Sequence, residues 1–167
     1  QPGAVGALHG AQLGDGIGEG GLAVLGDRIF ASGELSSTIA VFEARGRKLH
    51  AVRKLDLGPK LRGVRALAAA EGRLYAVDEL GGHVITIDLA NPGSQRGPRG
   101  GEATVAIAHA ENHLLVSCLT DRSLSILALD DAGFPIAEPA RRIVHDGPIW
   151  GFDAVVEVGA LLIALGG

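Results

Sequence analysis

Acidic residues stand near the ends of several short apolar runs in this sequence, and they are its best candidates for chemistry. Some follow such a run directly, and others lie just before the next one. Together with one arginine and the single tryptophan, the candidates are Glu19, Glu34, Arg62, Asp78, Glu79, Glu102, Asp121, Trp150 and Asp153. Carboxylate oxygens are hard ligands that suit calcium, so Glu19, Asp78 and Asp153 are candidate cation ligands. The alternative is that these residues are solvated loop positions.

The remaining reactive side chains give little support for catalysis. None of the six histidines stands in an H-E-x-x-H pair, and no serine stands in a G-x-S-x-G turn. His109 and His113 flank a tight turn and could share a metal, although ordinary hairpin pairing explains them better. Cys118 is expected to be a small core residue, since a reactive thiol needs a lowered pKa. We therefore do not expect this chain alone to be an enzyme, nor to require a cofactor.

The composition excludes several other classes of function. Lys and Arg total 15 against 19 Asp and Glu, and this balance excludes a general nucleic-acid-binding surface, which needs clustered positive charge. No apolar stretch reaches the ~18 residues of a membrane span. The single cysteine cannot form an internal disulfide. Because methionine is absent, we expect a processed chain or a piece of a longer protein.

The elements that must position the candidates are short strands in a repeating order. Four apolar runs begin at Ile29, Leu74, Leu114 and Leu161, 40 to 47 residues apart. Each follows a two-residue turn signal such as Glu71-Gly72, and another apolar run precedes each turn. Apolar runs joined by such a turn are typical of a β-hairpin.

Each of the first three repeats continues after its hairpin. An alternating run that predicts a third strand surrounds Ile39, Val84 and Leu124, ten residues after the start of the second strand. A fourth strand is expected at 49–57 and 140–145. In the second repeat, residues 92–101 are mostly Gly, Pro and polar residues, and we expect a flexible loop there.

Repeated four-stranded antiparallel units of this length predict an all-β fold of β-propeller blades. About three and a half blades fit in the chain, as a single partial propeller over 1–167. The expected blades cover about 20–58, 62–100 and 102–146, with the start of a fourth at about 150–167 and a strand or loop of a preceding blade at 1–19. Another all-β meander, such as a sandwich, is the alternative.

The segment Leu74–Asp88 resembles the repeat of the YVTN/lactonase-like (YncE-type) β-propellers, in which a strand, a small polar turn and a V-x-V-I-D-like strand follow one another. Gly33 and Cys118 stand where this family often has Asn. The resemblance implies an extracytoplasmic bacterial protein, periplasmic or secreted. Such repeats occur in binding proteins, in lactonases and in domains attached to haem proteins.

A second, shorter resemblance concerns Gly18-Glu19-Gly20, which is similar to the start of gluconolactonase-type propellers. In those proteins a Glu at the matching place binds a divalent cation, although the proline that follows Glu-Gly there is Gly21 here. This resemblance implies that Glu19, with Asp153, could bind calcium or another divalent cation.

The strand order predicts which candidate residues share a face. Turns from second to third strands and connections into the next blade lie at one end, here called the top face. We expect a scaffold that binds a ligand or partner protein through this channel face. A metal-dependent lactonase-like hydrolase and a structural domain of a larger redox or haem protein are the alternatives. The rest of the propeller, another copy or another chain is expected to complete the ring, unless residues 4–13 close a small one.

Overall fold

The computed structural model describes residues 20–166, except for 34–35, 60, 62, 92, 102, 137–138, 140, 148–150 and 158–159. For residues 94–96 and 151–166, only the backbone is described. In this part of the chain every regular element is a strand, and none is a helix. The predicted all-β fold is confirmed, and no described helix could cross a membrane.

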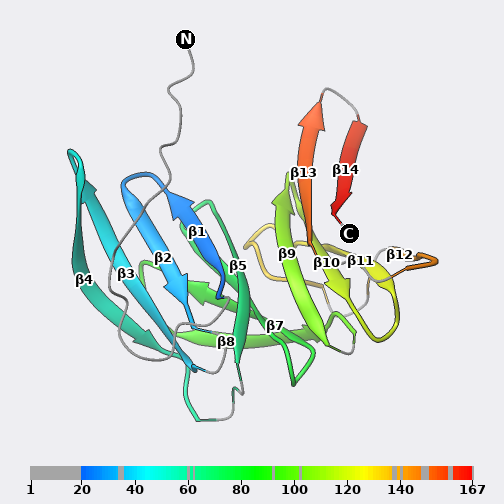
Figure 1. The fold of residues 1–167 in the computed structure, drawn as a ribbon, viewed down its shortest axis with the longest axis horizontal. Helices are drawn as coiled ribbons and strands as arrows, with labels where there is room; N and C mark the ends of the chain where they lie inside the picture. The colour runs from blue at the N-terminus through cyan, green and yellow to red at the C-terminus, as the bar shows by residue number, and fades with distance from the viewer. Residues whose placement is uncertain are drawn as a thin grey trace.

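Three four-stranded antiparallel sheets follow one another along the chain, and two strands begin a fourth (Figure 1). Blade 1 contains β1 (Leu22–Leu25), β2 (Arg28–Ser32), β3 (Thr38–Arg45) and β4 (Lys48–Asp56). Blade 2 contains β5 (Val64–Ala70), β6 (Arg73–Asp78), β7 (His83–Asp88) and β8 (Ser94–Arg99). Blade 3 contains β9 (Thr104–Ala110), β10 (His113–Cys118), β11 (Ser123–Ala128) and β12 (Arg141–Val144). The last pair is β13 (Gly151–Glu157) with β14 (Ala160–Gly166).

Each of the three sheets has its strands in chain order, as a propeller blade requires. The first strands of the blades are neighbours, with β5 between β1 and β9, and β9 also beside β13. Tight turns close the hairpins: Glu71 and Gly72 both have positive φ, at 49° and 78°, and Gly26 has φ 62°. Positive φ is what the favoured two-residue hairpin turns demand, so these residues set the register of their strands.

The loop predicted at 92–101 is wrong, because this segment contains strand β8. It pairs with β7 over Ser94–Arg99, with a register shift between His83 and Ile85. An outer strand has a single neighbour, so it needs neither an alternating apolar pattern nor a hydrogen-bond donor at every residue. Gly97 and Pro98 are therefore tolerated at this edge, although they hide the strand in the sequence.

The core lies between the sheets rather than within any one of them. One cluster joins blades 1 and 2 and includes Phe30, Ile39 and Leu74. A second joins blades 2 and 3 and includes Tyr75 and Leu114. Leu74 and Tyr75 are consecutive residues of β6, so they point to opposite faces of blade 2 and are buried on both.

The first prediction tests this core. We expect Leu114→Ala to lower the free energy of unfolding by about 2–5 kcal/mol, because Leu114 is 0% exposed and its loss leaves a cavity between blades. The matched control is Val52→Ala on the outer strand β4, where the side chain is 49% exposed and the cost should stay below about 0.5 kcal/mol. Denaturant unfolding measures both, and equal costs would contradict the inter-blade core.

Candidate functional site

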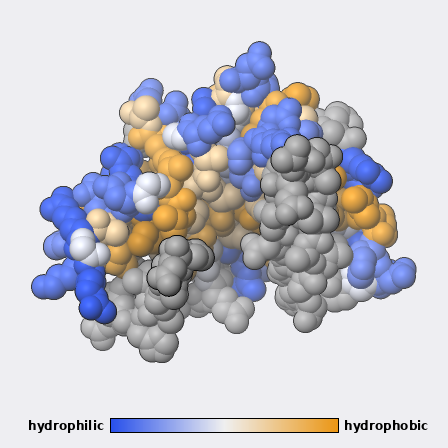
Figure 2. Space-filling model, turned by 90° about the horizontal axis from the view of Figure 1, so that it is seen from above, coloured by the Kyte–Doolittle hydropathy of each residue, from blue (hydrophilic) through white to orange (hydrophobic). Residues whose placement is uncertain are grey.

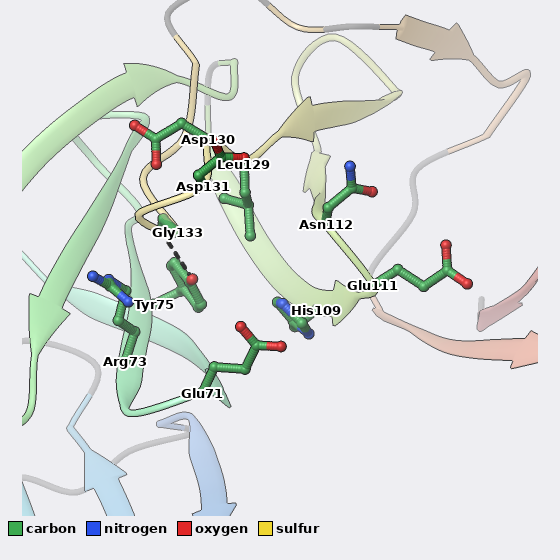
Figure 3. Close-up of a pocket in the computed structure, with 10 residues that line it drawn as sticks. All are labelled: Glu71, Arg73, Tyr75, His109, Glu111, Asn112, Leu129, Asp130, Asp131 and Gly133. Carbon is green, nitrogen blue, oxygen red and sulfur yellow. Dashed lines mark hydrogen bonds between the residues drawn. The ribbon is translucent and has the colours of Figure 1, made fainter.

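A pocket of about 300 Å³ lies at one end of the seam between blades 2 and 3 (Figure 3). The turn between β5 and β6, the turn between β9 and β10, and the loop after β11 surround it. This is the end opposite the top face. Its lining residues are Glu71, Arg73, Tyr75, His109, Glu111, Asn112, Leu129, Asp130, Asp131 and Gly133. The two turns occupy equivalent places in consecutive repeats, so the blade stacking itself brings Glu71 and Glu111 to one site.

A stacked pair of rings forms the wall of this pocket. The Tyr75 ring from β6 and the His109 ring from β9 have centroids 5.9 Å apart, with an angle of 11° between their planes. The Tyr75 hydroxyl donates a hydrogen bond of 2.9 Å to the carbonyl oxygen of Gly133. Burial raises the pKa of Tyr75, so its proton stays available for this bond. One residue of blade 2 thus holds a strand and a loop of blade 3.

Burial also lowers the pKa of His109 below the usual 6.5, although the nearby Glu71 carboxylate partly opposes this shift. A low-dielectric surrounding disfavours the charged imidazolium, and this effect exceeds the attraction of Glu71. His109 is therefore neutral near pH 7. His109 and His113 take part in ordinary hairpin pairing, as expected: His109 is opposite Leu114, and His113 is opposite Ala110.

Asp130 shapes the loop at the pocket rim. Its Oδ1 accepts hydrogen bonds from the N–H groups of Ala132, at 2.9 Å, and Phe134, at 2.8 Å. Gly133 has φ 74°, and a Cβ there would lie 3.2 Å from the Tyr75 hydroxyl oxygen. This position therefore needs glycine for its backbone conformation and for the close approach to Tyr75.

Arg73 is the one cation that lines the pocket. Its guanidinium carbon lies 5.0 Å from the centre of the Phe134 ring, which is a cation–π contact. Its Nε atom is buried and has no hydrogen-bond partner among the residues described. Arg73 thus packs beneath the loop, and carboxylates dominate the rim.

The lining is made of polar and charged side chains with two rings and one leucine. Apart from the Tyr75 phenol, the pocket residues carry no hydroxyl or thiol that could act as a nucleophile. Within the described ranges, no group of three His, Cys, Asp or Glu residues could hold a metal ion. Carboxylates, an amide and two ring faces remain, and they can accept hydrogen bonds and attract positive charge.

Several sequence-predicted candidates lie at the opposite, top face. Asp78 is buried at the end of β6, and Glu79 follows it in the turn to β7. Asp121 stands in the corresponding turn of blade 3 and forms an ion pair with Arg142 of β12. A ligand that used the Asp121 carboxylate would have to compete with this pair.

The other candidates cannot be compared with the structure. Glu19, Glu34, Arg62, Glu102 and Trp150 lie outside the described residues, and Asp153 is described by its backbone alone, within β13. The suggested cation ligands Glu19 and Asp153 therefore remain a prediction.

Cys118 is a buried core residue, as predicted. Burial, and to a lesser degree the Asp121 carboxylate, raises the pKa of its thiol. A thiol that stays protonated is a poor nucleophile, so this cysteine is structural.

Sequence reasoning missed most of the pocket. It singled out His109 and the Glu111-Asn112 turn, but not Tyr75, Arg73 or Asp130. One signal was present: the first hairpin turns of two consecutive repeats both begin with Glu, at Glu71 and Glu111. Equivalent turns of adjacent blades lie close together, so a polar site could have been expected there.

No family model and no curated protein matches this sequence. Solved structures do match its fold. One is a provisional 6-phosphogluconolactonase from Bacteroides fragilis, with 17% identity over 83% of this chain and 39% of that one, at a TM-score of 0.63. Another is the periplasmic gluconolactonase PpgL of Pseudomonas aeruginosa, with 19% identity, 84% and 40% coverage, and a TM-score of 0.59.

The computationally designed protein Ika4 matches with 15% identity over 96% of both chains, at a TM-score of 0.64. The chain thus spans about 40% of the length of the two gluconolactonase-type proteins. At these identities the likeness concerns the fold alone. The chain has a β-propeller fold and contains about three and a half blades of it.

The second prediction follows from the environment of His109. Above about pH 6.5 the group is neutral in the folded and unfolded chain. As the pH falls, the unfolded chain binds the proton first, because the pKa of His109 is lowered in the folded state. The stability present at higher pH is therefore lost as the pH falls through the folded pKa.

We expect wild type to lose more stability than His109→Gln between about pH 8 and about pH 5, as measured by denaturant midpoints. The other five histidines are common to both proteins, so their effects cancel in the comparison. Identical pH profiles would show that His109 does not titrate abnormally.

Proposed function

We propose that this chain is a scaffold of propeller blades that works by binding, and that a further blade packs against the outer face of blade 1. The observation that carries this proposal is the exposure of that face. Leu22 and Val24 of β1 are each 63% exposed, whereas Ala23 between them is buried against blade 2. A strand with apolar residues on both faces is typical of an inner propeller strand, which is covered on both sides.

The strand register extends this face across the sheet. Val24 is opposite Ile29, and Ile29 is opposite Phe42, so these residues lie on one face of blade 1. Hydrophobic side chains also reach the surface between hydrophilic ones in the view of Figure 2. An apolar sheet face of this extent favours a protein partner.

The equivalence of the repeats indicates what kind of partner fits. Counted back from the hairpin turns, Leu22 and Val24 of blade 1 correspond to Leu67 and Ala69 of blade 2. Leu67 and Ala69 belong to the core cluster with the preceding blade. By the same rule, the face formed by Leu22 and Val24 fits another propeller blade, in the way that blade 2 packs through Leu67 and Ala69 against blade 1.

A ligand or partner at the top face completes the proposed role. Glu79 and Asp121 support it, since they lie at the same end of adjacent blades and are partly exposed. The Pseudomonas aeruginosa neighbour is a periplasmic protein, and we propose the same location, periplasmic or secreted, for this chain.

The third prediction tests the open face of blade 1. A second copy can stand in for the missing blade, so we expect the purified chain to form particles above 17.0 kDa as its concentration rises. In Leu22→Ser/Val24→Ser the mass should return to that of one chain, because the apolar face is lost. The matched control is Val52→Ser/Val144→Ser, which changes exposed apolar residues on outer strands. Light scattering would refute the proposal if wild type and the face variant gave the same mass.

A lactonase-like hydrolase is the second candidate, and the likeness to gluconolactonase-type folds favours it. Glu19 and Asp153 would then bind a divalent cation. The fourth prediction, if this candidate is right, is that calcium or zinc raises the melting temperature and permits hydrolysis of gluconolactone. Both effects should disappear in Glu19→Gln. A chain whose melting temperature ignores both metals, and which leaves the lactone intact, would leave the scaffold as the better account.

A further inference from the structure

We propose that the free edge of strand β4 in blade 1 pairs with an extended, acidic peptide segment of another protein. In the described part of the chain, β3 is the one strand that β4 pairs with. An edge strand leaves every second residue's N–H and C=O groups unpaired, and an added strand can bond to them. β4 and β1 are at opposite edges of their sheet, so this inference stands independently of the proposed scaffold role.

The first observation is that β4 is better suited to pairing than the other two outer strands. It has nine residues and is the longest of the strands described. In contrast, β12 has four residues, and β8 contains Gly97 and Pro98. Short length and proline are two ways in which natural sheets prevent pairing at an edge, and β4 uses neither. It lies at the outer margin of the molecule (Figure 1).

One irregularity interrupts β4, but it does not end the ladder. A register shift between Val41 and Phe42 leaves Val52 as an extra residue in the outer strand. The pairing with β3 continues on both sides of this bulge, from Lys48 to Asp56. An added strand can follow the same bend, since β3 already does.

The second observation is the charge of this hairpin. The whole chain has a net charge of −4, whereas basic residues outnumber acidic ones in β3, β4 and the turn between them. All of these basic side chains are exposed. The basic residues are Arg45, Arg47, Lys48, Arg53 and Lys54, and the acidic ones are Glu43 and Asp56.

The register places like charges beside one another at the tip of the hairpin. Lys48 is directly opposite Arg45, and Arg47 lies in the turn between them. Directly opposite like charges destabilise a sheet. Glu43 forms an ion pair of 2.8 Å with Arg45, whereas Lys48 has no ion pair among the residues described. A carboxylate on an added strand would pair with Lys48 and offset this repulsion.

The backbone and the charges together restrict the partner to one kind. A second copy pairing through its own β4 is disfavoured, because the cations of both strands would meet. A nucleic acid would use the cations but would leave the backbone groups of the edge unpaired, and the rest of the chain would repel it. An extended peptide with carboxylates at alternate positions satisfies both features, since alternate side chains share one face of a strand.

The experiment is an NMR titration, at a concentration where each particle holds one chain. The probe is a short acetylated peptide amide in which Glu alternates with Thr. The same peptide with Gln in place of Glu is the uncharged control. A thymidine oligonucleotide tests for a contact made by charge alone.

We expect the acidic peptide to shift the amide signals of β4 in a saturable way. Those β4 amides that do not bond to β3 should exchange their hydrogens more slowly in the complex, because the added strand bonds to them. The Gln peptide should bind about tenfold more weakly, since it lacks the cross-strand charge pairs. The oligonucleotide should bind more weakly than the acidic peptide and leave the exchange rates unchanged.

A pair of matched variants tests the position of the site. Arg47→Gln/Lys48→Gln should weaken the acidic peptide about fivefold, since two cations next to the added strand are lost. Arg99→Gln/Arg141→Gln removes the same charge from exposed residues of β8 and β12 and should leave the affinity unchanged. The amide spectrum of each variant shows whether it is folded, and the exchange measurement on wild type does not depend on either.

The inference fails if the acidic peptide leaves the β4 signals unchanged, if the Gln peptide binds equally well, or if both variants lose the same affinity. Binding without slower exchange of β4 amides, or equally tight binding of the oligonucleotide, would also overturn it, since the contact would then use charge alone. Leu22→Ser/Val24→Ser should bind the acidic peptide like wild type. A failure of this inference is therefore distinguishable from a failure of the scaffold role.

Discussion

The contact of one apolar sheet face with the next is the interaction on which the rest of this structure depends. In β6 the consecutive residues Leu74 and Tyr75 are both buried, the first against blade 1 and the second against blade 3. A four-stranded sheet of this kind has no core of its own. Its stability is the sum of what it buries against its two neighbours, as in other repeat proteins. The same constraint underlies our proposal that a further blade packs against blade 1, where Leu22 and Val24 are exposed.

Sheet stacking also creates the pocket. The position two residues before the turn between the first and second strands is Val24 in blade 1, Ala69 in blade 2 and His109 in blade 3. In blade 3 a polar ring thus replaces an apolar or small residue, and it stacks on Tyr75. The loop after β11 covers the other side through the bond from Tyr75 to Gly133, a residue 58 positions away. A seam that is core along most of its length thus opens into a cavity at its end.

These relations explain what the sequence could and could not predict. Short alternating runs and turn pairs are local signals, so the inner strands and the buried Cys118 were predicted correctly. Strand β8 was missed because an edge strand depends on pairing with β7 rather than on its own pattern. The pocket was missed because its contacts cross between blades, as Arg73 with Phe134 does. Only the repeat of Glu at two equivalent turns, Glu71 and Glu111, pointed to it.

Hydrogen exchange measured by NMR tests the stacking account most directly, at a concentration where each particle holds one chain. Blade 2 lies between two neighbours, whereas blade 1 is covered on one face. The account predicts slower exchange for the amides of β6 and β7 than for those of β2 and β3, because opening a doubly covered sheet costs more free energy. Equal protection of the central strands of both blades would contradict it, since each sheet would then be stable without a neighbour on both sides.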